Sequence, residues 1–384
     1  MREVYLDNSA TTRVSDSASK AVFNVMTNFY GNPSSLHGKG IQAEKIIKGS
    51  RQTIAECLGV LPSELYFTSG GTESNNLAIK GSAYSMKRKG MHIITTKVEH
   101  PSVINVCERL KDQGFEVTYL DVDSDGVLKL EDLKSALTSK TILVSIMAIN
   151  NEVGSVQPIQ EAAKIIKENS NSLFHVDAVQ AFGKIPLVPG LKDIDLLSIS
   201  GHKIYGPKGI GVIFIREKTR ISSLFDGGGQ EKDIRPGTEN VPGIAGLEVA
   251  AKEAFENLDK WHDTMLGLKN CLKDGILEEI PDTVLNGPSF GGAPHILNIS
   301  FLGTKGEILL HALEEHGIYV STGSACSSHK KEQSHVLLAM GKGPEEIQGA
   351  IRFSLSPFLT IEDIEYTIDV LKKEVKTIRK FVRR

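Results

Sequence analysis

The side chains best suited to chemistry in this sequence are a lysine, a carboxylate, an imidazole and a glycine-rich turn, and each follows a predicted strand. Lys203 ends the segment SISGHK, Asp177 ends LFHVD, and His100 lies in VEHPSV. Gly71 and Thr72, in TSGGTESNN, lead into a predicted helix whose first backbone N–H groups could bind a phosphate. Further polar residues follow these strands or a neighbouring one: Asn151, Gln180, Ser200 and His202.

Pyridoxal phosphate is a cofactor that needs this combination of groups. Its phosphate requires an anion-binding turn, its pyridine nitrogen a carboxylate such as Asp177, and its aldehyde a lysine such as Lys203. A free lysine, with a pKa of about 10.4, is almost wholly protonated at neutral pH, and a desolvated site near other cations would lower that pKa. Taken singly, each residue has a simpler interpretation as a turn, a helix cap or a loop side chain. Their common position favours the cofactor site.

Cys326 is a separate candidate for chemistry. It lies among Ser, Thr and Gly in STGSACSSHKKEQSH, with cationic residues just beyond it that would lower the thiol pKa from about 8.5. An inert loop cysteine is the alternative. Cys57, Cys107 and Cys271 lie beside aliphatic residues at helical spacing, and we expect them to be small buried side chains. No CxxC pair exists, so neither a zinc module nor a disulfide framework is predicted.

Strands and helices alternate through the first two thirds of the chain. Mostly near-continuous apolar runs predict strands at 65–68, 92–96, 116–120, 141–149, 173–176, 194–200 and 210–215. Helical patterns lie between most of them, including 73–88 and 159–168. This order predicts an α/β fold with a mainly parallel sheet covered on both faces, which binds ligands beyond the carboxyl ends of its strands. The segment GKGIQA formally matches a dinucleotide fingerprint, but no strand precedes it and we discount it.

The rest of the chain suits a smaller α+β domain. We expect a large domain at 14–256 and a small domain at 257–384 that also includes 1–13. A long helical stretch (244–279) precedes a strand (296–301), a helix (307–316), the Cys326 segment and a terminal amphipathic helix. Thr360 and Asp363 resemble a capping pair at the start of that last helix.

The composition limits the classes of partner that we expect for this protein. Hydrophobic residues make up 40% of the 384 residues and charged residues 24%, with a net charge of −3. This near-balance gives no basic surface for nucleic acid or for an anionic membrane. The N-terminus lacks an apolar signal core and no run approaches the length of a membrane span. We therefore expect a cytoplasmic protein without nucleic-acid or membrane partners.

Ten segments together resemble the cysteine desulfurases of the NifS/IscS type, within the class V aminotransferase family. They are YLDNSATT, NPSSLH, TSGGTESNN, EHPSV, NNEVG, HVDAVQ, SGHKIYGPKGIG, RPGTEN, STGSAC and IRFSL, and they extend from Tyr5 to Leu355. The resemblance implies the fold of type I pyridoxal-phosphate enzymes, with a seven-stranded large domain, a smaller C-terminal domain and a homodimer. It implies removal of sulfur from L-cysteine to give alanine and a persulfide on Cys326, supplying iron–sulfur cluster assembly and other sulfur transfer through an acceptor or scaffold protein.

The resemblance also implies roles for the cofactor residues. Lys203 would bind pyridoxal phosphate covalently, Asp177 would pair with its pyridinium nitrogen, and Gln180 would contact its ring hydroxyl. His100 would stack on the ring and act as a proton shuttle. The phosphate ligands would be Gly71, Thr72, Ser200 and His202, joined by Thr238 of the partner subunit.

For the substrate, the resemblance implies that Asn151 lies by the cofactor and that Arg352 grips the carboxylate. In AIRFSLS the apolar residues alternate with Arg352, which places its side chain opposite the apolar face. Without the resemblance, a solvated strand arginine would be the commoner reading. No intrinsic metal is expected, although Cys326 could transiently bind an iron–sulfur cluster.

Departures from the family pattern are few. Arg13 stands where a proline is common, Asn8 and Ser9 replace a more usual pair, and SSHKKEQ after Cys326 leaves the sulfur acceptor open. Two alternatives also stay open. A selenocysteine lyase or another class V enzyme would share the cofactor site, and a non-catalytic assembly scaffold would share the fold.

Overall fold

The computed structural model describes residues 2–187, 191–322 and 333–382. Its centre is a seven-stranded sheet in the order β2-β8-β7-β6-β5-β3-β4. The strands are β2 (Leu65–Thr68), β3 (His92–Thr96), β4 (Glu116–Leu120), β5 (Thr141–Met147), β6 (Leu173–Asp177), β7 (Leu196–Ser200) and β8 (Gly211–Ile215). The strand β8 runs antiparallel to both β2 and β7, and the other neighbouring pairs are parallel, so the predicted mainly parallel α/β sheet is confirmed.

Helices cover both faces of this sheet, which explains why its strands are apolar without alternation. On one face lie α3 (Gly71–Met86) and α4 (Pro101–Lys111), which pack on residues such as Ile93 and Leu196. The other face carries residues such as Val144 and Leu197, in a cluster that also includes side chains of the other helices. Those helices are α1 (Asp16–Asn28), α2 (Gly38–Leu58), α5 (Leu130–Ala136), α6 (Ile159–Asn169) and α7 (Val241–Glu256).

A second group of elements has its own sheet, in the order β12-β10-β9. Its antiparallel strands are β9 (Thr283–Asn286), β10 (Ile296–Phe301) and β12 (Ala350–Ser354). With them lie α8 (Leu258–Glu279), α9 (Gly306–Glu314), α10 (His335–Ala339), α11 (Pro344–Gln348) and α12 (Ile361–Val382). Short 3-10 helices lie at Pro62–Glu64, Gly201–Lys203 and Gln230–Asp233.

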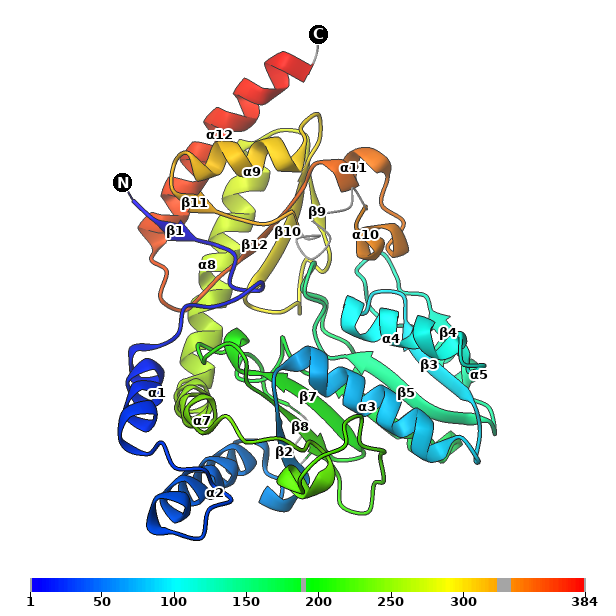
Figure 1. Ribbon diagram of the computed structural model, residues 1–384. Coiled ribbons are helices and arrows are strands. Elements are labelled where there is room, and N and C mark those ends of the chain that lie inside the picture. Colours follow the sequence, from blue (N-terminus) through cyan, green and yellow to red (C-terminus); the bar gives the residue numbers. More distant parts are fainter. Residues whose placement is uncertain (1, 188–190, 323–332, 383–384) are drawn as a thin grey trace.

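The N-terminus belongs with these C-terminal elements. The strand β1 (Val4–Tyr5) pairs in parallel with β11 (Ile318–Tyr319), and Figure 1 shows both near α9 and α12. Val4 and Leu6 pack into the same apolar cluster as the strands β10 and β12. The first residues of the chain therefore reach the small sheet before the chain enters α1.

Several predicted boundaries need correction. The strand expected to end at 149 ends at Met147, because the Asn150 side chain accepts hydrogen bonds from the N–H groups of Glu152 and Val153 and turns the chain. The single helix expected over 244–279 is two helices, since Asn257 between them leaves the helical backbone region (φ −112°, ψ 12°). The helix α1, capped by Ser15, was not predicted.

Two further expectations concern the cap of the last helix and membrane-spanning segments. Thr360 and Asp363 do form a reciprocal cap at α12: the Thr360 N–H lies 3.0 Å from Asp363 Oδ2, and the Asp363 N–H 3.4 Å from Thr360 Oγ1. None of the described helices is both long enough and apolar enough to cross a bilayer.

Candidate active site

A cavity of about 620 Å³ opens at the carboxyl ends of the parallel strands. The predicted residues that line it are Gly71, Thr72, His100, Asn151, Asp177, Gln180, Ser200, His202, Lys203 and Arg352. The structure thus brings together side chains from six separate segments of the chain. Ser9, Ala10 and Thr11 also line the cavity and were not predicted.

Lys203 lies in a tight connection between β7 and β8. Hydrogen bonds from the Gly201 N–H to the Ile210 carbonyl and from the Gly206 N–H to the Gly201 carbonyl, both 3.0 Å, close this connection. The Lys203 amine donates to the carbonyl oxygens of Ser9 at 2.5 Å and Ala10 at 2.7 Å. The N-terminal loop therefore holds the amine at the cavity wall.

Asp177 ends β6 and is almost completely buried. One carboxylate oxygen accepts from Asn75 Nδ2 at 2.7 Å and the other from the Val179 N–H at 3.0 Å. These bonds fix the orientation of a carboxylate in the cavity wall, as partnering a pyridinium nitrogen requires. Asn75, on α3, is a cavity residue that sequence reasoning missed, although it lies in the quoted segment TSGGTESNN.

His100 is the N-cap of α4. Its Nδ1 accepts from the Ser102 N–H at 3.1 Å and lies 2.8 Å from Ser102 Oγ. Burial lowers the pKa of His100; nearby Asp177 acts in the opposite direction, and Lys203 acts with burial. The imidazole is therefore disposed to be neutral near pH 7, with its Nδ1 side committed to the cap.

The start of α3 offers an anion cradle. A Cβ on Gly71 would lie 2.7 Å from Val179 Cγ2, so only glycine fits this close approach. Beside it, Ser200 Oγ is buried with no hydrogen-bond partner among the residues that the structure describes. Burial, assisted by Lys203 and Lys208, lowers the pKa of His202 to about 4, which leaves a neutral ring. A helix start and an unpaired buried hydroxyl suit a phosphate.

Arg352 is not a solvated strand arginine, because only 3% of the residue is exposed. Its Nη2 lies 2.7 Å from Asp7 Oδ1, and its Nη1 donates to the Asn151 carbonyl at 3.0 Å. Its Nε has no partner within the described ranges. The guanidinium is thus anchored by two segments, and Arg352 contributes to the cavity wall.

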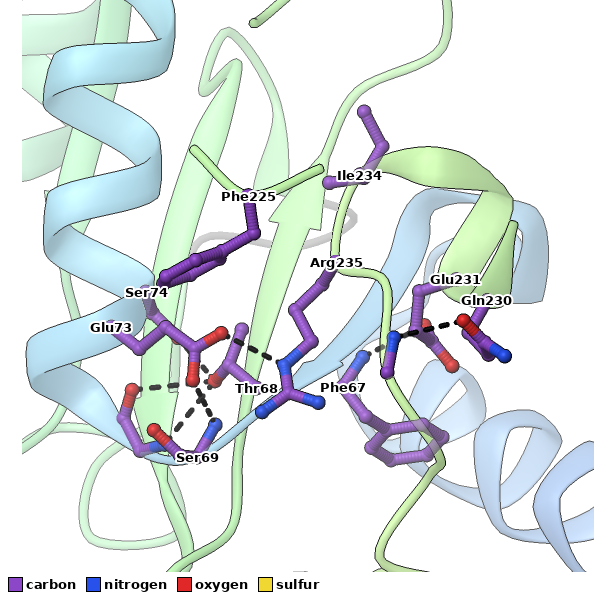
Figure 2. A network of polar contacts seen from close by, with 12 residues as sticks. Phe67, Thr68, Ser69, Glu73, Ser74, Phe225, Gln230, Glu231, Ile234 and Arg235 are labelled. Atoms are coloured by element: carbon purple, nitrogen blue, oxygen red, sulfur yellow. Dashed lines mark hydrogen bonds and ion pairs between the residues drawn. The ribbon is translucent and has the colours of Figure 1, made fainter. Parts of the chain in front are cut away.

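Thr238 is the predicted cofactor residue that the structure keeps out of this cavity: it is exposed and does not line the wall in the single chain. The segment before it is tied to the start of α3, as Figure 2 shows, by Arg235 Nε at 2.9 Å from Glu73 Oε1. Glu73 also accepts from the Ser69 N–H at 2.7 Å. Burial tends to raise the pKa of Glu73, but the hydrogen bonds from Ser69 and Arg235 outweigh it and lower the pKa.

A second anchor in Figure 2 secures the same segment. Glu231 accepts from the Phe67 N–H at 2.9 Å, beside which Figure 2 shows it. It also pairs with Arg51 at 2.6 Å. Its side chain is buried, whereas that of Arg51 is partly exposed. The segment that carries Thr238 is therefore fixed to β2 and α2 at one end.

Cys326 lies outside the described residues. Just beyond it, Ser334 Oγ donates to Glu152 Oε2 at 2.6 Å and His335 Nε2 to the Glu99 carbonyl at 2.9 Å. Of the other cysteines, Cys107 is buried as expected, and burial raises its pKa to about 12. Cys57 and Cys271 are only partly buried, which corrects the expectation. No cluster of three or more potential metal ligands occurs in the described part of the chain.

Comparison with known proteins identifies the family of this chain. The family described as Aminotransferase class-V matches residues 4–367. The chain belongs to the class V aminotransferase family. It is 46% identical to a protein of Dictyoglomus turgidum named cysteine desulfurase IscS, over 98% of this chain and 96% of that protein. It is also 46% identical to a protein of Methanosarcina thermophila with the same name, over 98% of this chain and 93% of that one.

Solved structures agree with this membership. A structure titled NifS-like protein superposes with a TM-score of 0.92 at 40% identity, covering 98% of this chain and 100% of the other. A NifS-like protein from Rickettsia africae gives a TM-score of 0.87 at 33% identity, with coverages of 98% and 100%. The expected type I pyridoxal-phosphate fold is therefore confirmed.

Class V aminotransferases and cysteine desulfurases use pyridoxal phosphate, and the cavity fits this cofactor. The unpaired Ser200 hydroxyl and the Gly71 cradle suit its phosphate, while the buried carboxylate of Asp177 suits its ring nitrogen. Lys203 supplies an amine at the same wall. The residues that would hold the cofactor therefore surround one cavity.

Proposed function

We propose that this chain is a pyridoxal-phosphate-dependent cysteine desulfurase that converts L-cysteine to L-alanine and leaves a persulfide on Cys326. The observation that carries the proposal is the shared cavity of Lys203, Asp177 and Arg352. A lysine and a buried carboxylate suit the cofactor, and an anchored guanidinium in the cavity wall suits the carboxylate of an amino acid. The curated relatives named cysteine desulfurase narrow the substrate to cysteine.

The roles of this chain's residues follow from their positions. Arg352 binds and orients the substrate carboxylate, with Asn151 beside it. Lys203 takes the α-proton of the bound amino acid and returns it, while Asp177 keeps a ring nitrogen protonated. When bound, pyridoxal phosphate accepts the electrons that the α-carbon releases. His100, a partly exposed residue of the cavity wall whose pKa burial lowers, moves protons at the substrate.

Sulfur transfer requires the thiolate of Cys326. Its sulfur forms a bond to the substrate sulfur while the carbon–sulfur bond breaks, and the electron pair of that bond passes to the substrate carbon. Protonation of that carbon gives alanine, and the persulfide remains on Cys326. Transfer of this sulfur to a thiol acceptor or an iron–sulfur scaffold protein regenerates the thiol of Cys326. We further propose that Cys326 can transiently bind an iron–sulfur cluster.

We also propose a homodimer in the cytoplasm, in which Thr238 contributes to the phosphate site of the other subunit. Its exposure, and the anchoring of its segment by Glu73 and Glu231, support this. The proposed domains are 14–256 and 257–384 with 1–13. The seven-stranded and three-stranded sheets have different apolar clusters, apart from Ala293 and Ile296, which pack with the larger one. These clusters and the break at Asn257 support that division.

One incubation tests the proposal. The purified chain receives L-cysteine, and alanine and sulfide are measured with and without a thiol reductant. We expect alanine in both samples and sulfide chiefly with the reductant, because the reductant releases persulfide sulfur. A preparation without bound pyridoxal phosphate would instead indicate an assembly scaffold. Alanine formation that does not depend on Cys326 would indicate a selenocysteine lyase or another class V activity.

A further inference from the structure

A buried histidine that the proposed mechanism does not use contacts a residue of the cavity wall. His295 directly precedes β10 and only 1% of it is exposed. Its Nε2 lies 3.3 Å from Oε1 of Gln180, which follows β6 and lines the cavity. A side chain next to the three-stranded sheet therefore reaches a cavity residue next to the seven-stranded sheet.

The partner atom shows which ring nitrogen of His295 carries the hydrogen. A carboxamide oxygen can only accept, so His295 Nε2 must carry the hydrogen and donate it. Burial lowers the pKa of His295 well below its ordinary value, and the charges of Lys184, Lys269, Arg352 and Lys203 act in the same direction. His295 is therefore neutral, with one N–H at Nε2. Its Nδ1 has no hydrogen-bond partner in the part of the chain that the structure describes.

The Ser9 carbonyl, which can only accept, sets the orientation of the Gln180 amide, and the His295 donor secures it. With Oε1 held by His295, Nε2 faces the Ser9 carbonyl and donates to it at 3.0 Å. The same carbonyl accepts from the Lys203 amine at 2.5 Å. A flipped amide would set its oxygen against the Ser9 carbonyl. It could keep the contact with His295 only if the ring hydrogen moved to Nδ1, where it would have no partner among the described residues, so both ends oppose the flip.

The orientation has a consequence for a ligand beside Lys203. An amide nitrogen carries two hydrogens, and one of them is engaged by Ser9. The second remains as a donor on a residue that lines the cavity close to the lysine. An oxygen next to the aldehyde of pyridoxal phosphate would accept it, and a donor stabilises that oxygen in its anionic form.

We propose that His295 is a positioning residue, which by holding the Gln180 amide presents an N–H donor to the cofactor oxygen beside Lys203. The inference rests on the proposed function, since it requires bound pyridoxal phosphate. His295 touches neither substrate nor cofactor and acts through Gln180 alone.

The test is a pH titration of the visible absorption of the lysine-bound cofactor. Stabilising the anionic oxygen weakens its hold on the neighbouring imine proton, so the donor lowers the titration midpoint. We expect His295→Phe to raise that midpoint by about 0.5–1 pH unit. His295→Gln, which can still donate to Oε1, should largely restore it. We also expect a lower kcat with little change in KM, because His295 does not bind the substrate.

Two controls separate this role from a merely structural one. His92 is a buried histidine held by Thr141 and Thr118 that does not line the cavity, and His92→Phe should leave the midpoint unchanged. In a Gln180→Leu background, His295→Phe should add no further shift, and this comparison also serves if His295→Phe alone folds poorly.

The outcomes separate the two proposals. Normal cofactor binding with an unchanged midpoint in His295→Phe, or an equal shift in the Gln180→Leu background, would overturn the role of His295 while leaving the cofactor site intact. Wild-type protein that binds no pyridoxal phosphate would overturn the proposed function itself.

Discussion

Arg352 Nη2 and Asp7 Oδ1 lie 2.7 Å apart, in an ion pair that joins β12 to the first loop of the chain. Both the arginine and most of the aspartate are withdrawn from solvent. The pair holds the guanidinium plane in place before any substrate arrives, which lowers the entropy that substrate binding would otherwise lose.

Replacing Arg352 by lysine tests the carboxylate role. Lysine keeps the charge but loses the planar fork, and the loss of a charged hydrogen bond costs about 1.5–3 kcal/mol. We expect KM for L-cysteine to rise roughly 10- to 100-fold, with a smaller change in kcat, as measured by steady-state alanine formation. Arg2→Lys, at the more exposed pair with Asp363, is the matched control and should change neither constant. An unaltered KM in Arg352→Lys would refute the assignment.

Lys203→Ala tests the covalent attachment of the cofactor. We expect loss of the visible absorption of the lysine-bound cofactor and a fall in alanine formation of about 10²–10⁴-fold, because the proton-transferring group is gone. Lys184 is the stringent control, since burial lowers its pKa to about 7 and makes it a competing amine. Lys184→Met should retain the absorption. If Lys184→Met lost it and Lys203→Ala kept it, the attachment would belong to Lys184.

Cys326→Ser tests the sulfur carrier. The variant should keep its bound cofactor but form no persulfide from L-cysteine, as read by mass spectrometry of the intact chain. Cys271→Ser is the control, because that thiol is partly exposed and burial, with nearby Glu365 and Asp274, raises its pKa. Wild-type alanine production in Cys326→Ser would contradict the proposed role.

Glu99 should make stability depend on pH. It is fully buried, burial raises its pKa to about 8, and its Oε2 has no partner within the described residues. A raised folded-state pKa means that the protonated group contributes stability below the unfolded pKa of about 4.3, and that this is lost as pH rises toward 8. The loss is about 1.4 kcal/mol per pH unit within that window.

We therefore expect the unfolding temperature of Glu99→Gln, relative to that of wild type, to be higher at pH 9 than at pH 5. Scanning calorimetry at the two pH values would measure this difference. The amide cannot ionise, so it escapes the loss. Glu131→Gln, at an exposed site on α5, should show no such difference between the two pH values. Parallel pH profiles for Glu99→Gln and wild type would show that Glu99 is already ionised in the folded protein.

Much of the sheet and of its edge could be predicted from sequence. Asp177 and Lys203 lie where continuous apolar runs end, and the carboxyl ends of parallel strands meet at one edge of a sheet. Their pairing with a cofactor followed from side-chain chemistry. The resemblance to a family, rather than periodicity, assigned individual roles such as that of Arg352.

Other parts of the site left no such signal. The carbonyl groups of Ser9 and Ala10 that bind Lys203 belong to the backbone, and every residue carries one. His295 contacts Gln180 across 115 positions of the chain, which no local pattern reports. The break between α7 and α8 was missed because Asn257 interrupts a pattern that is otherwise helical on both sides.

The hydrogen bonds of the N-terminal loop bear on when this protein becomes competent during its synthesis. Ser9 donates its N–H to Ser354 at 2.8 Å, and the Asn8 side chain donates to the Ser354 carbonyl at 2.9 Å. A ribosome releases this loop and Lys203 well before Ser354, so the loop gains these two hydrogen bonds only after β12 has been synthesised. We therefore expect stable capture of the cofactor to follow the synthesis of β12.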